Sequence, residues 1–140
     1  MKRYVEEIRK LAGTKVDFTA VQAQLANTDS GAKAYETALA SAISGANATA
    51  LAKANHVLYG SERSLILDKG LPGRDWYRHQ IYAPGMYTGY GAKTLPGIRE
   101  AVEGSRWDEA NREAEDVARV LEGLNQRIED ATKALEKTMR

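Results

Sequence analysis

The chain has no cysteine, only three prolines and only two histidines among its 140 residues. Without cysteine, neither a disulfide framework nor thiolate chemistry is available to it. Its 20 basic and 19 acidic residues leave a formal net charge of +1. It therefore lacks the global positive charge of proteins that bind nucleic acid or anionic membranes, and we expect no nucleic-acid partner.

Long apolar runs are also missing. No stretch approaches the roughly 18 consecutive apolar residues of a transmembrane helix. Met1 leads directly into KRYVEEIRK, which contains no apolar signal-peptide core. A length of 140 residues is typical of one domain that buries its own core. These features predict a soluble single domain over residues 1–140, with no membrane insertion and no targeting segment.

The motifs of common catalytic sites are absent as well. A catalytic zinc site needs three protein ligands, usually with two closely spaced, but His56 and His79 are far apart and form no HExxH pair. The serines form no GxSxG motif, and GYGAK at residues 89–93 lacks the GxxxxGK[ST] spacing of a phosphate-binding loop. No metal or other cofactor is therefore expected in this chain. Enzyme activity of the chain itself is the least supported functional hypothesis.

Hydrophobic periodicity predicts an all-α, up-and-down bundle of four main helices. The expected segments are residues 1–12, 18–44, 47–67 and 105–140, with a short helix at 96–102. Gly13 suits the end of the first helix, and Asp17, Asn47 and Ser105 suit the N-caps of the others. The sequence NTDSG at residues 27–31 interrupts the second segment, where one helix with a weak middle is favoured over two helices.

The last predicted helix carries the most regular pattern in the chain. Its apolar residues alternate by steps of three and four: Trp107, Ala110, Ala114, Val117, Leu121, Leu124, Ile128, Ala131 and Leu135. A period of 3.5 predicts packing against neighbouring helices at about +20°. Val117, Leu121, Leu124 and Ile128 form the centre of this seam. Two interpretations stay open, an intramolecular core and a dimer contact.

One long segment separates the predicted helices. Residues 70–98, GLPGRDWYRHQIYAPGMYTGYGAKTLPGI, contain all three prolines and four of the seven tyrosines. A loop of this length without secondary structure of its own is usually either functional or disordered, and its aromatic content argues against disorder. We expect a long ordered loop laid across the bundle, with its aromatic side chains packed on the helices.

Four loop residues are expected to hold this loop in place: Arg74, Arg78, His79 and Tyr82. The arginine guanidinium groups are suited to pin the loop through backbone carbonyls or a carboxylate. A hydrogen-bonded structural histidine is favoured over a ligand at His79. Tyr87 and Tyr90 differ, because neighbouring glycines let the backbone approach a ligand or another domain.

The motif LPGRDWYRHQIYAP at residues 71–84, the tyrosine- and glycine-rich turn after it, and LPGI at 95–98 carry a resemblance to a known family. They resemble the C-terminal helical domain of the transferrin receptor and glutamate carboxypeptidase family of zinc peptidases, including the pair Arg78 and His79. The resemblance is specific over residues 58–135, whereas residues 1–57 share only helical character. It implies a transferrin-receptor-like dimerisation domain, with a second copy and the peptidase domain of a parent protein as partners.

The resemblance also implies a role for the tip of the loop. In the glutamate carboxypeptidases this turn reaches the active site, where a lysine–tyrosine pair helps to hold the terminal glutamate of the substrate. Counted back from LPGI, the tyrosine corresponds to Tyr90 and the lysine to Gly89. Tyr87 and Tyr90 are therefore the expected substrate-pocket residues. The absent lysine argues against glutamate specificity in the parent enzyme.

These observations lead to one main hypothesis. The chain is a non-catalytic helical domain that mediates homodimerisation of a zinc-dependent peptidase and contributes loop residues to its substrate pocket. Zinc would be bound in the parent peptidase domain, and the family suggests a periplasmic, extracellular or cell-surface location. The alternative is a free-standing helical bundle that binds a partner protein or a small ligand through its aromatic loop.

Overall fold

A computed structural model describes residues 1–89 and 91–137 of the chain. Its elements are α1 (Lys2–Ala12), α2 (Thr19–Ser44), α3 (Ala48–Tyr59), the 3₁₀ helix η1 (Ser61–Leu65), β1 (Tyr82–Pro84), β2 (Ala92–Thr94), α4 (Pro96–Glu103) and α5 (Trp107–Glu136). The predicted all-α fold is confirmed, because helices account for most of the described residues and the two strands are only three residues long. Across the same residues, no helix combines the length and apolar character that a membrane span requires.

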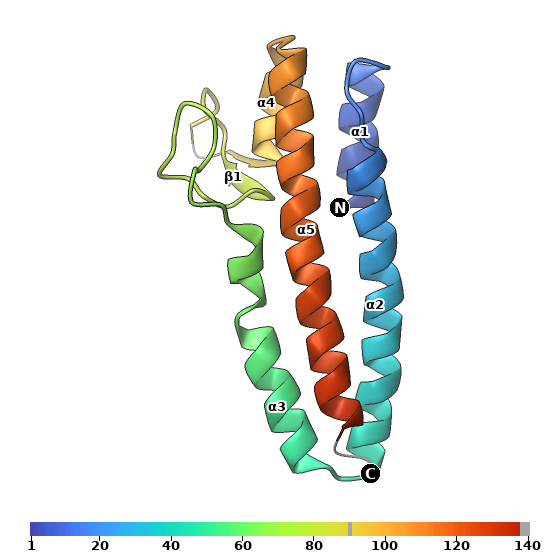
Figure 1. The fold of residues 1–140 in the computed structure, drawn as a ribbon. Helices are drawn as coiled ribbons and strands as arrows, with labels where there is room; N and C mark the ends of the chain where they lie inside the picture. The colour runs from blue at the N-terminus through green and yellow to red at the C-terminus, as the bar shows by residue number, and fades with distance from the viewer. Residues whose placement is uncertain (90, 138–140) are drawn as a thin grey trace.

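Helix α5 lies at the centre of an up-and-down arrangement (Figure 1). It packs against α2 on one side and α3 on the other, and its N-terminal part also contacts α4. Helices α1 and α4 pack together near the start of α5, at the same end of the molecule as the loop. The turn between α2 and α3 lies at the opposite end (Figure 1).

The core is divided into two clusters along the bundle. The larger one joins α1, the first half of α2, α4 and the first half of α5, with Ile8, Val21, Ile98 and Val117 among its buried side chains. The smaller one joins the second halves of α2 and α5 to α3, and it consists of Ala38, Ala42, Ala50, Ala54, Ala131 and Leu135. Because alanine side chains are short, the second cluster buries much less apolar surface than the first.

A polar layer on α2 and α5 lies between these clusters. The hydroxyl of Thr28 donates to Asn125 Oδ1 at 2.7 Å, and Asn125 Nδ2 donates to the carbonyl oxygen of Gln24 at 3.0 Å. Gly31 lies one turn further along α2, where a Cβ atom would stand 3.3 Å from Ile128 Cγ2. These contacts with α5 stabilise the helical conformation of residues 27–31, NTDSG. Residues 19–44 therefore form one helix, as predicted.

Several predicted helix ends are confirmed and others are wrong. Gly13 ends α1 with a φ of 59°, and Asn47 caps α3 by accepting a hydrogen bond from the Ala50 N–H at 3.1 Å. The third helix is shorter than predicted, because it ends at Tyr59 and η1 follows it. The capping role of Ser105 is wrong, since its φ of 54° is left-handed and α5 begins only after Arg106.

Asp17 is displaced by one position from the cap that was predicted. Phe18 is the N-cap residue of α2, while Asp17 Oδ1 accepts a hydrogen bond from the Thr19 N–H at 2.8 Å. Hydrogen bonding with the Thr19 side chain, and then with its backbone N–H, lowers the pKa of the Asp17 carboxyl group. The carboxylate therefore still supports the first turn of the helix, although from outside it.

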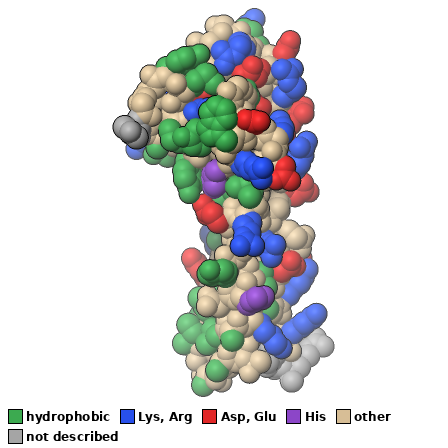
Figure 2. All heavy atoms as spheres, turned by 90° about the vertical axis from the view of Figure 1, so that its left-hand side faces the viewer, with side chains coloured by type: hydrophobic (Ala, Val, Ile, Leu, Met, Phe, Trp, Pro, Cys, Tyr) green, Lys and Arg blue, Asp and Glu red, His purple; other side chains and the backbone are tan. Residues whose placement is uncertain are grey.

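The loop differs from its prediction in two respects. It contains a short antiparallel sheet, in which Tyr82 is paired with Thr94 and Pro84 with Ala92. Most of its aromatic side chains also face outward: Trp76 is 70% exposed, Tyr82 53% and Tyr87 92%. Hydrophobic side chains accordingly gather over the loop in the upper half of Figure 2. The expectation that they pack on the helices is wrong, because backbone pairing and buried polar contacts order the loop instead.

Candidate functional site

The loop between η1 and α4 folds as two successive turns. In the first turn, the Leu67 N–H donates to the carbonyl oxygen of Arg78 at 3.0 Å, and the Leu71 N–H donates to that of Tyr77 at 2.9 Å. Gly70 makes this turn possible. Its φ is +67°, and a Cβ atom there would lie 2.1 Å from the backbone oxygen of Asp75. The second turn contains β1 and β2.

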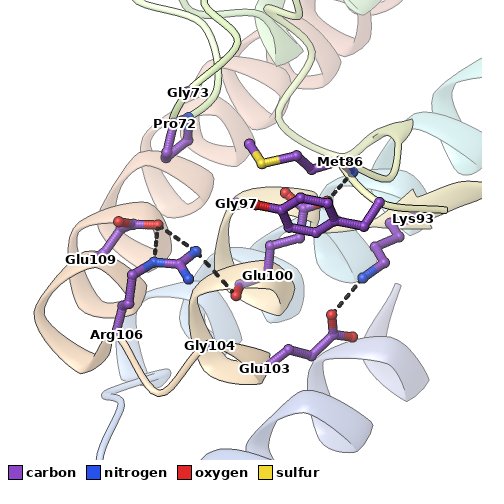
Figure 3. Close-up of a pocket in the computed structure, with 11 residues that line it drawn as sticks. Pro72, Gly73, Met86, Lys93, Gly97, Glu100, Glu103, Gly104, Arg106 and Glu109 are labelled. Carbon is purple, nitrogen blue, oxygen red and sulfur yellow. Dashed lines mark hydrogen bonds and ion pairs between the residues drawn. The ribbon is translucent and has the colours of Figure 1, made fainter. Parts of the chain in front are cut away.

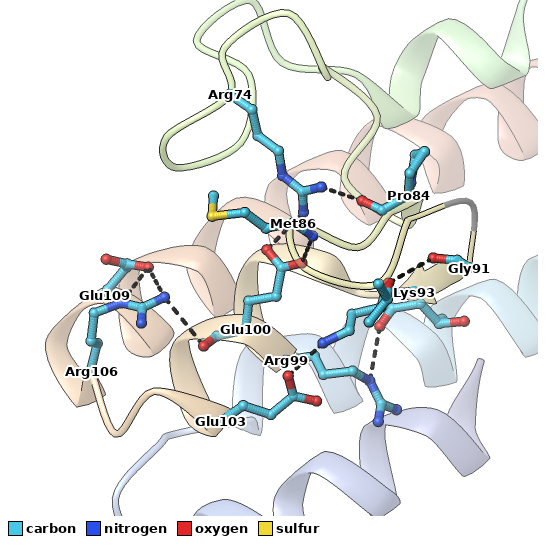
Figure 4. A network of polar contacts seen from close by, with 12 residues as sticks. Arg74, Pro84, Met86, Gly91, Lys93, Arg99, Glu100, Glu103, Arg106 and Glu109 are labelled. Atoms are coloured by element: carbon cyan, nitrogen blue, oxygen red, sulfur yellow. Dashed lines mark hydrogen bonds and ion pairs between the residues drawn. The ribbon is translucent and has the colours of Figure 1, made fainter.

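A buried ion pair joins both turns to α4 (Figure 4). The side chain of Arg74 is only 5% exposed, and its guanidinium group donates to the carbonyl oxygen of Pro84 and, at 2.7 Å, to Glu100 Oε2. The other oxygen of Glu100 accepts a hydrogen bond from the Met86 N–H at 2.8 Å. One carboxylate on α4 therefore fixes the first turn through Arg74 and the second through Met86.

Arg78 and His79 occupy a different part of the loop. The Arg78 side chain is 55% exposed and pairs with Asp68 at 3.2 Å, so its contact is at the surface. His79 Nδ1 accepts hydrogen bonds from the backbone N–H groups of Ile81 and Tyr82. Its Nε2 therefore carries the proton and donates to Glu62 Oε1 at 3.1 Å.

Tyr82 completes this second attachment. Its ring lies 4.1 Å from the His79 ring, and its hydroxyl donates to the same Glu62 oxygen at 3.0 Å. The hydrogen bond to the Glu62 carboxylate raises the pKa of the Tyr82 phenol. His79 and Tyr82 thus tie the second half of the loop to η1, whereas Arg74 ties the loop to α4.

The tip of the loop projects into solvent. Tyr87 is 92% exposed, and Tyr90 lies outside the described residues. The tip is closed by hydrogen bonds from Gly85 N–H to the Gly91 carbonyl oxygen at 3.0 Å and from the Thr88 hydroxyl to the same oxygen at 3.1 Å. Tyr87 is consequently presented by a turn that is held at its base.

A cavity of about 410 Å³ lies beside Tyr87 (Figure 3). Its walls come from the loop, α4 and the start of α5, and include Pro72, Met86, Tyr87, Lys93, Glu100 and Arg106. The charged groups around it are paired with one another. Arg106 contacts Glu109 at 3.1 Å, which raises the pKa of Arg106, and Lys93 contacts Glu103.

A buried carboxyl group lies beneath the first turn. Glu113 on α5 is 4% exposed, and its Oε2 atom makes no hydrogen bond to the described residues. Burial raises the pKa of Glu113, and the ammonium group of Lys69, 3.7 Å away, opposes that effect. Burial acts to lower the pKa of Lys69, but its contacts with Asp116 and Glu113 raise it overall. A second cavity, of about 390 Å³, is lined by Glu113 and by residues 69–75.

The centre of the α5 seam lies inside the single chain. Val117 is 2% exposed and Leu121 3% exposed, and both belong to the larger core cluster. Leu124 is half-buried against the same cluster, and Ile128 is half-buried beside Gly31. Among residues 1–89 and 91–137, no three His, Asp or Glu side chains are grouped so that they could hold a metal ion.

The sequence matches the family of transferrin receptor-like dimerisation domains over residues 1–135. The chain belongs to this family. The match extends the resemblance seen in the sequence motifs to the first 57 residues, where only helical character had been recognised. The transferrin receptor-like dimerisation domain thus includes α1 and α2 as well as the loop.

Relatives of this dimerisation domain are much longer proteins. A probable glutamate carboxypeptidase of Arthroderma benhamiae is 29% identical over 108 residues, covering 74% of this chain and 15% of that protein. A probable glutamate carboxypeptidase of Arabidopsis thaliana is 37% identical over 59 residues, 42% of this chain and 9% of its own length. An inactive zinc metalloprotease of Schizosaccharomyces pombe is 31% identical over 67 residues, 48% of this chain and 8% of its own length.

Sequence reasoning did not single out the carboxylates that hold the dimerisation domain's loop. Glu100 and Glu62 each accept hydrogen bonds from two loop groups, and both lie outside the aromatic segment of residues 70–98. Glu113 was also missed, because acidic residues on a helix are most often solvent-exposed. The sequence feature that could have indicated the burial of Glu113 is its position next to Ala114, at the edge of the wide apolar face of the last helix.

Proposed function

We propose that this dimerisation domain joins two copies of a zinc-dependent peptidase and that its loop completes the peptidase's substrate pocket. Zinc and the catalytic groups would lie in the peptidase domain, and this chain would contribute no catalytic residue. The names of two relatives support the link to carboxypeptidases, and the matched segment forms only a small part of each. The inactive metalloprotease among the relatives is in keeping with a domain that does not itself supply the catalysis.

The observation that carries the pocket proposal is the exposure of Tyr87 on a fixed turn. Tyr87 is 92% exposed, yet the Met86 N–H beside it is held by the half-buried Glu100. Trp76 and Met86 are exposed on the same loop. A group of exposed apolar side chains on an ordered loop is typical of a surface that another protein or domain covers. The peptidase domain is the partner that we assign to this surface.

The alternative function, binding of a small ligand by the isolated domain, accounts less well for the structure of this loop. The cavity beside Tyr87 has a suitable size, but ligand pockets are mainly apolar with a few polar groups left available. Around this cavity, Arg106 is engaged by Glu109 and Lys93 by Glu103. These ion pairs would have to be broken before a ligand gained the charged groups.

The pocket proposal is tested by catalysis in the whole peptidase encoded with this domain. Replacing Tyr87 with alanine should raise KM for peptide substrates, because a pocket wall is removed without a change to the metal site. Tyr59→Ala is a matched control, since Tyr59 is 90% exposed on α3 and lies away from the loop. Unchanged KM and kcat in the Tyr87 variant would refute the role of this residue in the pocket.

The dimerisation proposal is tested separately, by sedimentation equilibrium of the 140-residue chain. We expect a reversible monomer–dimer equilibrium whose midpoint depends on protein concentration. If the chain stays monomeric from about 1 μM to about 1 mM, any dimer is too weak to be specific. That result would refute self-association of the isolated domain.

A further inference from the structure

The ring of His79 holds the start of β1 through its unprotonated nitrogen. Nδ1 accepts hydrogen bonds from the backbone N–H groups of Ile81 and Tyr82, at 3.2 and 3.3 Å. The other nitrogen, Nε2, lies 3.1 Å from Glu62 Oε1 on η1. The ring therefore lies between two elements of the fold, and its two nitrogens have opposite hydrogen-bonding roles.

The N–H group of Ile81 depends on this acceptor. Ile81 is 7% exposed and belongs to the larger core cluster, so its N–H group is shielded from water and needs a partner within the protein. Its carbonyl oxygen accepts a hydrogen bond from the Leu95 N–H at 2.7 Å, which fixes this residue next to the two-stranded sheet. Without Nδ1 as acceptor, the start of β1 has to move before the N–H group can reach water.

Protonation would change Nδ1 of His79 from an acceptor into a donor. A neutral imidazole has one acceptor nitrogen and one N–H group, whereas an imidazolium has two N–H donors and no acceptor. The added proton would point at two backbone N–H groups, so both of those hydrogen bonds would be lost. The contact of Nε2–H with the Glu62 carboxylate would remain and would become an ion pair. The protonated ring would thus stay attached to η1 and release β1.

The groups around the ring fit such a change. Glu62 faces the ring from η1, and Tyr82 faces it from β1, with the two ring centres 4.1 Å apart. The Tyr82 hydroxyl donates to the same Glu62 oxygen at 3.0 Å. Arg78 is next to His79 in the chain, but it pairs with Asp68 at 3.2 Å. A carboxylate lies on one side of the ring and two backbone donors on the other, so the two protonation states favour different positions of β1.

The position of His79 separates it from the other groups that titrate. Histidine is the side chain that ordinarily changes its charge between pH 5 and 8, and the other histidine, His56, is exposed on α3. Burial raises the pKa of Glu113, but this carboxyl group lines the cavity beneath the first turn and not β1. The attachment of the second turn to α4, from the Met86 N–H to Glu100, involves no histidine.

We propose that His79 is a pH-sensitive switch in the loop, which holds the start of β1 when it is neutral and releases it when it is protonated. The released segment includes Tyr82, which is 53% exposed on the same loop as Tyr87. Acidification then changes the surface that we assign to the peptidase domain, while the attachment to α4 keeps its place. This effect on a partner rests on the proposed function, whereas the switch itself is a property of the isolated chain.

Hydrogen exchange of single backbone amides, followed by NMR at about pH 7.5 and about pH 5.5, tests the switch. An imidazole outside a fold is about one-tenth protonated at the higher pH and about nine-tenths protonated at the lower. The protection factors of the Ile81 and Tyr82 amides should therefore fall about tenfold on acidification, whereas that of the Met86 amide should not change. Equal protection of Ile81 and Tyr82 at both pH values overturns the switch.

His79→Asn and His56→Asn are the matched variants. The side-chain oxygen of asparagine accepts hydrogen bonds as Nδ1 does, but it does not titrate, so His79→Asn should protect Ile81 and Tyr82 equally at both pH values. His56→Asn removes the other histidine and should keep the full response of the unmodified chain. A response that persists in His79→Asn overturns the switch and assigns the pH dependence to another group.

A titration of the unmodified chain decides the case in which asparagine does not replace the contacts of His79. The ¹⁵N chemical shifts of the ring report its protonation directly, and their midpoint should coincide with the loss of protection at Ile81 and Tyr82. Different midpoints overturn the switch. None of these outcomes involves the peptidase domain, so unchanged kinetics of Tyr87→Ala in the whole peptidase would refute the proposed pocket role and leave the switch in place.

Discussion

The buried pair of Arg74 and Glu100 should dominate the stability of the loop. The Arg74 side chain is 5% exposed and that of Glu100 13%, and Glu100 also holds the Met86 N–H. Replacing Glu100 with alanine leaves a buried guanidinium group without its counter-charge, and loss of one partner of a buried pair typically costs about 3–5 kcal/mol. For a domain of this size, that loss corresponds to a fall in Tm of about 10–20 °C if the whole domain unfolds together.

The assay is chemical and thermal denaturation followed by two signals. Circular dichroism reports the helices, and tryptophan fluorescence reports both Trp76 in the loop and Trp107 at the start of α5. Substituting Trp107 with phenylalanine in all samples leaves Trp76 as the only tryptophan. In Glu100→Ala, we expect the Trp76 signal to change at a lower denaturant concentration than the helical signal, because the loop loses its main attachment to α4.

Glu103→Ala is the matched control, since Glu103 is on the same helix and pairs with Lys93, but its side chain is 44% exposed. Exposed ion pairs contribute about 0–1 kcal/mol, so this variant should unfold almost as the original chain does. If Glu100→Ala and Glu103→Ala lower the stability by the same small amount, the Arg74–Glu100 pair does not hold the loop and the reasoning is refuted.

Three further predictions concern stability. Gly70→Ala should lower the free energy of unfolding, measured with denaturant, by about 2–3 kcal/mol, because Gly70 has a positive φ and an added Cβ would clash with Asp75. Gly13→Ala is the control, since Gly13 also has a positive φ but open space around it, and it should lower the free energy by only about 1–2 kcal/mol. Equal losses in the two variants would contradict the clash. Glu113→Gln should be more stable than the original chain at pH 7. Burial raises the Glu113 pKa above its usual value of 4.5, so the contribution of this carboxyl to stability is complete only below pH 4.5 and is lost as the pH rises. The difference in stability between Glu113→Gln and the original chain should therefore shrink on acidification. A difference that does not depend on pH would contradict this prediction. Leu121→Ala should cost about 2–5 kcal/mol in unfolding as a core residue, and unchanged stability with a lost dimer would instead place Leu121 in an interface.

Helical periodicity was sufficient to predict most of the bundle. Residues that recur every three or four positions share one face, so Ala110, Val117 and Leu121 could be assigned to a packed face before any contact was known. The same rule does not distinguish a core from an interface, and that question required the burial of Val117 and Leu121 in the single chain. Helix ends were less predictable, because Ser105 is a good cap by residue type but has a left-handed backbone.

The loop could be recognised from sequence, but its contacts could not. Arg74 and Arg78 look alike in the motif, yet only Arg74 is buried, and its partner Glu100 lies 26 residues further along the chain. Pairings of this kind depend on how the two turns fold and leave no periodic signal. The outward position of Tyr82 and Tyr87 was missed for a related reason, because aromatic side chains ordinarily favour burial.

The polar layer formed by Gln24, Thr28 and Asn125 separates the apolar packing at one end of the domain from the apolar packing at the other. The two apolar clusters on either side of it share no member, so a substitution in the alanine-rich cluster repacks side chains that do not reach the loop. The layer also fixes how α2 and α5 are aligned, through specific hydrogen bonds that a shift along the helix would break. A substitution in the alanine-rich cluster can therefore change how α2, α3 and α5 pack at that end without changing the hydrogen bonds that hold the loop to α4.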